Sequence, residues 1–473
     1  MSTSALAAAS AALGGDEALL DNLTIRGPRA ILASPLAVGD HAIACTASAL
    51  LAASQLAEAR GQARPAVTLD AQHVAASFTS ERHLRIDGHG FGAGFAPLST
   101  WLQTADGWLR SHANYPHHRA ALLAALQTRE DLDAVSAAAA TRQTEELEEA
   151  IFAAGGCAGA VRERAAWEAH PAGRAIADSG LLDLTPGRLA AAPLTPLNED
   201  DLPATGIRVL DLTRVIAGPV AGRTLAALGA EVLRIDAPGL LEIEASAVDT
   251  GPGKRSALLD LRDSQRTFHE LLSEADVLIE GYRPGALDAI GFGTRALAER
   301  YPNLVTASLS AWGDEGPWGR RRGFDSLVQA VTGIAVACTP EGAVHPGALP
   351  AQALDHGTGH LIAAAVLRGL TERTRTGRPL HARFALARTA RWLLELPTAP
   401  EQADTASPKP ADPDGYRIEY PYREHTVSLI APPGELDGRP LRWLTGPEPI
   451  GSSPAAWSRP PHHGPERASA EAS

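Results

Sequence analysis

The chain has 473 residues, 45% of them hydrophobic, and a formal charge of −13 at pH 7. This length predicts two or three globular units, each with its own core. The acidic balance argues against nucleic acid as a partner, because binding a phosphate backbone needs clustered cations.

Neither the start of the sequence nor its most apolar run indicates a membrane anchor. No charged leader followed by an apolar segment opens the chain, and residues 42–53 are short and interrupted by Thr and Ser. We therefore expect no membrane partner and a cytoplasmic location. Cys45, Cys157 and Cys338 are far apart without paired spacing, so they predict neither disulfides nor a metal site and are interpreted as small buried residues.

Shifts in composition divide the chain into segments. Ala-rich helical patterns precede a Pro-containing connector, and a strongly patterned block follows from Gly206. Beyond this block, Pro, Ala and Asp dominate one stretch, and β-like alternation follows at 416–430. The predicted segments are an N-terminal segment at 1–24, a second region at 25–195, a linker at 196–204, an α/β domain at 205–398, a linker at 399–415, a short β segment at 416–447 and a disordered tail at 448–473.

The block from Gly206 has the order strand, turn, helix, strand. Residues 207–212 and 231–236 are β-rich runs, and a Gly-Pro turn and a helical pattern at 221–228 separate them. This order predicts a right-handed βαβ crossover between parallel strands. Further helices are expected at 266–274 and 296–301, with strands after them at 277–280 and 304–309. The predicted fold class is α/β, a doubly wound parallel sheet with a smaller α+β domain.

Ligands of doubly wound sheets bind at the carboxyl ends of the strands. The turn at 214–219 is therefore a candidate ligand loop, although a tight connection made of small residues is an equal alternative. The block lacks the Gly-x-Gly-x-x-Gly pattern, so no dinucleotide cofactor is indicated.

Several short motifs in this block resemble the CaiB/BaiF, or class III, CoA-transferase family. They are Val209–Pro219, Leu228–Val232, Gly253–Ser256 with Leu259–Leu261, Ala275–Val277 with Tyr282–Gly285, Ser308–Ser310, Gly316-Pro317 and Gly323–Ala330. Each motif is weak alone, but their order and spacing together predict that this block is a member of the family.

The resemblance implies coenzyme A, or an acyl-CoA, as a substrate and no permanently bound cofactor. Coenzyme A presents phosphates that need cations. The positions that match the family's CoA-binding sites or supply further positive charge are Arg214, Ala217, Arg234, Lys254, Arg255 and Arg283. Each charged residue has the alternative of being a solvated surface cation.

Asp355, within Ala353–His360, matches the family's catalytic aspartate at the start of a helix. The resemblance implies a transferase in which this carboxylate attacks an acyl-CoA, forms a mixed anhydride and then an aspartyl-CoA thioester, and passes CoA to a carboxylic acid. A helix N-terminus is expected to keep the carboxylate ionised. The alternative is a structural N-cap aspartate.

Two other functions stay open. Racemases of 2-methylacyl-CoA share the fold but place a histidine where this chain has Phe324, before Asp325, so one of two opposed bases is missing. His356 and His360 lie near Asp355 in sequence without occupying that position. A protein that binds acyl-CoA without catalysis is the other alternative.

Residues 25–195 resemble the family's C-terminal half, so the order of the two halves is inverted. Thr104–Trp108, the helix at 117–126, Glu145–Glu148 and Gly155–Cys157 show this resemblance. Because the halves are inverted, the chain is expected to be a homodimer or a pseudo-dimeric monomer that holds parts the family supplies from two chains. No glycine-rich loop that would close over an intermediate is recognised.

An internal repeat supports this interpretation. Asp40-His41 and the residues to Leu69 resemble Asp355-His356 and the residues to Leu386. Two truncated copies joined head to tail explain the pattern, and Asp40 then competes with Asp355 for the role of nucleophile.

Overall fold

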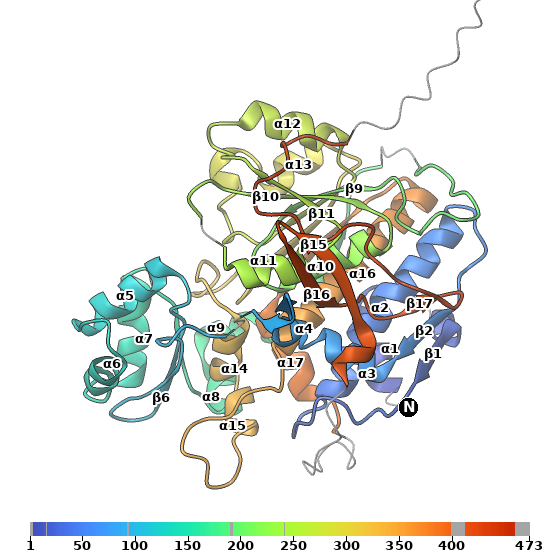
Figure 1. Ribbon diagram of the computed structural model, residues 1–473. Coiled ribbons are helices and arrows are strands. Elements are labelled where there is room, and N and C mark those ends of the chain that lie inside the picture. The colour runs from blue at the N-terminus through green and yellow to red at the C-terminus, as the bar shows by residue number, and fades with distance from the viewer. Residues whose placement is uncertain are drawn as a thin grey trace, which may run out of the picture.

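The computed structural model describes residues 3–15, 17–91, 94–189, 193–240, 242–398 and 412–458. A seven-stranded sheet forms the centre of the larger domain in this part of the chain (Figure 1). In sheet order its strands are β11 (Lys254–Leu258), β10 (Glu231–Asp236), β9 (Arg208–Leu212), β12 (Val277–Glu280), β13 (Val305–Ser310), β14 (Leu380–Ala385) and β8 (Asp183–Pro186). The strands are parallel except for β8, which pairs with β14 in the antiparallel direction.

Helices cover both faces of this sheet. On one face, Val209 and its neighbours pack against α10 (Ala217–Ala227) and α16 (Ala353–Thr376). On the other face, Leu210 and its neighbours pack against α12 (Gln265–Glu274) and α13 (Thr294–Arg300). Burial on both faces explains the continuous apolar runs in the strands, and the predicted doubly wound sheet is confirmed.

The smaller α+β domain is also confirmed. Its strands β5 (Trp101–Gln103), β6 (Trp108–Ser111) and β7 (Ala158–Ala160) form an antiparallel sheet, and its helices are α5 (Pro116–Leu126), α6 (Leu132–Ala139) and α7 (Thr144–Ala153). These elements share a hydrophobic core of their own. In Figure 1 the domain, coloured cyan, extends to one side of the larger domain.

Helix α2 (Val38–Ala59) lies parallel to α16 in the centre of the molecule. His41 Nε2 is 3.1 Å from the carbonyl oxygen of Ala353 near the start of both helices, and Arg368 bonds Gln55 near their ends. The apolar run expected at 42–53 thus belongs to a helix of 22 residues, long and apolar enough to cross a membrane, but 89% of its apolar window is buried inside the protein. It is a core helix.

The sequence repeat has a structural counterpart. Helix α2 is followed by β2 (Val67–Asp70) and α3 (Ala71–Ser77), as α16 is followed by β14 and α17 (Leu386–Glu395). Strand β2 pairs in parallel with β1 (Leu23–Arg26), as β14 does with β13. The origin of the two units from fused copies stays a prediction.

The C-terminal strands join the N-terminal half of the chain. The alternation at 416–430 forms the hairpin β15 (Arg417–Tyr422) and β16 (His425–Ile430), which pairs with β3 (Arg85–Ile86) and its partner β4 (His89–Gly90). Strands β17 (Glu435–Leu436) and β18 (Arg439–Pro440) extend the sheet of β2. The remaining helices are α1 (Thr3–Ala12), η1 (Glu17–Asn22), α4 (Ser80–His83), α8 (Arg164–Ala169), α9 (Pro171–Ala177), α11 (Glu244–Thr250), η2 (Asp288–Ile290), α14 (Asp325–Val331), α15 (Ile334–Ala337) and η3 (Pro413–Tyr416).

Part of the tail expected to be disordered makes specific contacts. Ser453 N donates to Ser256 O at 2.8 Å, and Trp457 Nε1 donates to Leu271 O at 3.1 Å. Residues 448–458 therefore lie against the α/β domain, while 459–473, and 399–411 of the predicted linker, lie outside the described residues.

The contact of α2 with α16 requires a glycine at position 357, because a Cβ there would lie 2.2 Å from His41 Nε2. We expect Gly357→Ala to destabilise the protein by about 1–3 kcal/mol through overpacking. The measurement is the thermal unfolding temperature. In a His41→Ala background, Gly357→Ala should lower the unfolding temperature less than in the wild type. An equal loss of stability in both backgrounds would contradict this packing.

Candidate functional site

Asp355 lies in the first turn of α16, at the carboxyl edge of the parallel sheet. The helix begins at Ala353 after Gln352, so Asp355 is not the N-cap residue. At the other end of the helix, Arg373 bonds Asp276 at 2.8 Å, just before β12 begins. The start of α16 is therefore at the edge where doubly wound sheets bind ligands.

The carboxyl of Asp355 is buried beside a second carboxyl. Its own backbone N–H donates to Asp325 Oδ2 at 3.0 Å, and Gln329 holds the other oxygen of Asp325. Within the described part of the chain, the side chain of Asp355 itself makes no hydrogen bond and retains 6% exposure for the residue.

Burial, together with the charges of Asp325 and Glu81, raises the pKa of Asp355 well above its usual range. Burial also raises the pKa of Asp325 to about 6. Burial and like charge therefore oppose ionisation of Asp355, contrary to the expectation that the helix N-terminus favours the ionised form.

Glu81 comes from α4, in the N-terminal half of the chain. Its Oε2 lies 3.3 Å from His356 Nε2. Burial alone would raise the pKa of Glu81, but the hydrogen bond and charge of His356 lower it below its usual range. Phe78 lies beside the ring of His356 at 5.4 Å between centroids. The surroundings of Asp355 are thus completed by residues from both halves.

The turn at 214–219 lies against the beginning of α16. A Cβ at Gly359, one turn after Asp355, would lie 2.4 Å from the carbonyl oxygen of Ala217. Val215 has φ of 70°, an unusual conformation for a β-branched residue. Such strained residues are frequent at functional sites, and here the strained turn lies next to the helix of the buried carboxyl.

Lys254 supports this turn from inside the protein. Its Nζ donates to Asp211 Oδ2 at 2.8 Å and to the carbonyl oxygen of Pro219 at 2.7 Å. Burial lowers the pKa of Lys254 to about 8. A Cβ at Gly222 would lie 2.5 Å from Asp211 Oδ2, so the glycine leaves room for the pair. Lys254 therefore positions the turn and does not face solvent.

Arg234 and Glu242 connect the turn to the small domain. Arg234 forms a two-pronged contact with Asp236, at 2.7 and 2.8 Å, and lies 3.3 Å from Glu242. Glu242 accepts a hydrogen bond from Tyr115 OH at 2.7 Å and pairs with Arg214 Nε at 3.5 Å. Burial would raise the pKa of Glu242, but Arg234 and Arg214 lower it. The network fixes how the two domains meet beside the turn.

Two of the predicted cations lie at opposite edges of the sheet. Arg283 follows β12 at the carboxyl edge and is exposed; burial and then the charge of Arg322 lower its pKa. Arg255 lies near the start of β11, at the amino edge, where it pairs with Glu231 at 3.5 Å and bonds Ala456 O at 2.8 Å. The structure thus brings together Arg214, Ala217, Arg234 and Lys254 around the turn. Arg283 lies at the same edge of the sheet, and Arg255 lies at the opposite edge.

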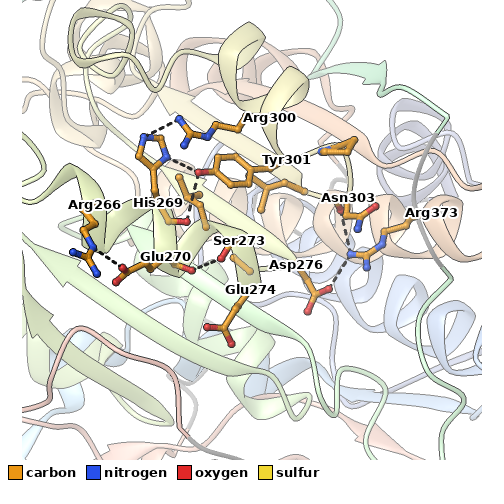
Figure 2. Close-up of a pocket in the computed structure, with 14 residues that line it drawn as sticks. Arg266, His269, Glu270, Ser273, Glu274, Asp276, Arg300, Tyr301, Asn303 and Arg373 are labelled. Carbon is orange, nitrogen blue, oxygen red and sulfur yellow. Dashed lines mark hydrogen bonds and ion pairs between the residues drawn. The ribbon is translucent and has the colours of Figure 1, made fainter.

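A pocket of about 810 Å³ opens at the amino edge of the sheet (Figure 2). Its lining includes Tyr301, Asp276 and Arg373, with Tyr301 OH 2.5 Å from His269 Nδ1. Arg373 is 18 residues from Asp355 along α16, which corresponds to about 27 Å at 1.5 Å per residue. This pocket is therefore separate from the candidate active site.

Some residues of the site were not predicted from sequence as functional. Asp325 was noticed only beside Phe324, whose ring stacks on His112 from the small domain with centroids 3.5 Å apart. Glu81 and Tyr115 have no local pattern that distinguishes them. Only the contact between distant segments shows that they belong to the site.

The comparisons with known proteins match the second half of the chain, which contains the parallel sheet. The family profile described as CoA-transferase family III matches residues 205–424. A probable fatty acyl-CoA transferase of Mycobacterium tuberculosis, Rv3272, is 38% identical over 198 residues, covering 38% of this chain and 50% of the relative. The human succinyl-CoA:glutarate CoA-transferase is 32% identical over 194 residues, which cover 38% of this chain and 44% of that relative. A crystal structure of Rv3272 matches 40% of this chain and 57% of the Rv3272 chain, with 38% sequence identity and a TM-score of 0.38.

The candidate site, a buried carboxyl at the carboxyl edge of a parallel sheet, lies in an α/β domain. Residues 205–424 carry the similarity to CoA-transferase family III. It spans about half the length of the curated relatives that it matches, between 44% and 50% for those named above.

The buried pair under the turn predicts unequal effects of two similar substitutions. Lys254→Met leaves Asp211 as an unpaired buried charge and should destabilise the protein by about 3–5 kcal/mol. Arg255→Met removes only a partly exposed ion pair and should cost less than about 1 kcal/mol. Thermal unfolding followed by circular dichroism compares them. Equal losses would contradict the structural role of Lys254.

Proposed function

We propose that the protein is a CoA-transferase that moves coenzyme A from an acyl-CoA to a carboxylic acid, with Asp355 as the nucleophile. The observation that supports this best is the position of Asp355. It is a buried carboxyl with no hydrogen bond from its side chain in the described part of the chain, inside a family III domain and beside the strained turn at 214–219.

The proposed reaction has four balanced steps. The Asp355 carboxylate attacks the thioester carbonyl, and CoA thiolate leaves as a mixed anhydride forms. The thiolate then attacks the Asp355 carbonyl, which releases the first acid and forms the aspartyl-CoA thioester. The acceptor carboxylate attacks this thioester and releases CoA thiolate again. The thiolate attacks the acyl carbonyl of the new anhydride, which yields the new acyl-CoA and free Asp355.

We assign the predicted CoA-binding residues different parts in this reaction. Arg214 and Arg283, at the carboxyl edge, are placed to meet the phosphates of coenzyme A. Ala217 gives a small residue at the turn, and Arg234 and Lys254 hold that turn from below. Arg255 lies at the far edge and has no direct part in binding in this proposal.

The relatives' names include fatty acyl-CoA, succinyl-CoA, glutarate and oxalate as substrates. For this chain we propose a carboxylic acid as acceptor and a cytoplasmic location. Because Glu81 and Tyr115 from the N-terminal half reach the site, we propose that one chain supplies the complete active site as a pseudo-dimeric monomer.

The first test is to trap the acylated or CoA-bound aspartate. The protein is incubated with a panel of acyl-CoAs, treated with hydroxylamine and analysed by mass spectrometry. We expect a modification at Asp355 that is absent from Asp355→Ala, with CoA transfer reduced by about a thousandfold or more.

Asp40→Asn is the matched control, since Asp40 occupies the equivalent turn of α2, and it should keep the adduct and the activity. An adduct at Asp40 would move the nucleophile to the first repeat. Binding of CoA without any adduct or transfer would instead support a non-catalytic protein.

The second prediction concerns pH. Attack requires the ionised form of Asp355, whose pKa is raised by burial, Asp325 and Glu81. The rate should therefore fall as the pH falls through this raised pKa, above the usual range for an aspartate. Asp325→Asn removes one like charge, which favours ionised Asp355, so the acid limb of kcat/KM against pH should move to lower pH. An acid limb that stays in place, or moves upward, would contradict the coupling of the two carboxyls.

A further inference from the structure

Arg110 is a buried arginine of the small domain that faces away from that domain's core. It lies on the middle strand, β6, directly opposite Trp101 of β5 and Gly159 of β7. Its neighbour Leu109 points to the other face, into the core with α5 and α7. Arg110 therefore belongs to the face of the sheet that looks toward α14.

Among the residues that the structure describes, the guanidinium of Arg110 has no anionic partner. The residue is 8% exposed, and its charge lies 4.7 Å from the ring centre of Phe95 and 5.1 Å from that of Trp101. In the described part of the chain its side chain makes no hydrogen bond or ion pair, yet its nitrogens are not fully closed off from solvent. Burial, with no opposing charge, lowers the pKa of Arg110 to about 10. Buried charges in proteins are normally paired, so this site lacks an anion.

The position of Arg110 connects it to the candidate active site. His112 follows on the same strand face, about 7 Å along the strand at 3.4 Å per residue. Its ring stacks on Phe324 with centroids 3.5 Å apart and planes 2° from parallel. The next residue, Asp325, accepts the hydrogen bond from Asp355 N at 3.0 Å.

Helix α14 can approach this face because of a glycine. A Cβ at Gly159 would lie 2.9 Å from Val331 Cγ2 and 3.1 Å from Leu327 O. The absence of a side chain next to Arg110 therefore lets the helix that begins at Asp325 pack directly on the small sheet. The same packing sets α14, which begins with Asp325, against the sheet face that carries Arg110.

We propose that Arg110 binds a second anionic group on the acid whose carboxylate reacts at Asp355, so that the substrates are dicarboxylic acids. This inference rests on the proposed function. The guanidinium matches a carboxylate through two parallel hydrogen bonds, and the rings of Phe95 and Trp101 offer apolar contact for the carbon chain between the two carboxylates. A phosphate of coenzyme A is the other source of an anion, but the turn and cations placed to meet CoA lie on the α/β domain.

The test compares succinate with butyrate, which have the same number of carbons and differ in the second carboxylate. CoA transfer to each acid is measured for the wild type, Arg110→Met and Arg110→Lys. The wild type should prefer succinate in kcat/KM by about 30-fold or more, since truncating one member of a buried charge pair costs about 2 kcal/mol or more. Arg110→Met should lose this preference, and Arg110→Lys should keep part of it.

Arg129→Met is the matched control in the same domain. The Arg129 side chain is 80% exposed, and its ion pair with Asp131 is long, at 3.7 Å. This variant should keep the preference, and thermal unfolding shows whether each variant is folded. No preference for succinate in the wild type, or an unchanged preference in folded Arg110→Met, would overturn the proposal.

Binding measurements separate this proposal from the proposed function. Isothermal titration calorimetry with succinate, butyrate and CoA is carried out on the wild type and Arg110→Met. If no acid accepts CoA, the transferase proposal fails, while succinate binding that depends on Arg110 still supports the anion site. Weaker CoA binding in Arg110→Met with unchanged binding of succinate would assign the residue to a CoA phosphate and overturn the proposal.

Discussion

The parallel contact between α2 and α16 is the constraint on which the rest of the structure depends. It joins the two halves of the chain along most of two long buried helices, and Gly357 permits the close approach of His41. The two helices begin at the same end of the molecule. After α2 the chain forms β2 and α3, and the next helix, α4, reaches the start of α16. Without this packing, Glu81 would not lie beside His356 and Asp355, and the site would be open on that side.

Burial, more than helix direction, determines the electrostatics of the site. A backbone hydrogen bond holds Asp355 beside Asp325, and burial raises the pKa of both carboxyls. The charges of Asp325 and Glu81 raise the pKa of Asp355 further. The cations nearby are treated differently. Lys254 and Arg234 are each paired with a carboxylate inside the protein, so they stabilise the turn and its surroundings.

The sequence predicted well those strands and helices that are determined by residues close together in the chain. The strands at 231–236 and 277–280 and the helix at 266–274 were predicted almost to the residue, because apolar runs and turn residues alternate clearly there. Asp355 was found through motif order. Strand β8 was missed, since its short polar segment has no β pattern and is held by β14. Asp325, Glu81 and Arg110 could not be assigned from sequence, because their environment comes from segments far away in the chain.

The origin of Glu81 has a genetic consequence. In an enzyme whose sites are shared between subunits, two differently damaged chains can restore one intact site when they assemble together. Here the glutamate beside Asp355 belongs to the same chain as Asp355. Under the proposed single-chain active site, a chain damaged at one of these residues and a second chain damaged at the other would each keep its own defect, so two such alleles in one cell would not complement each other.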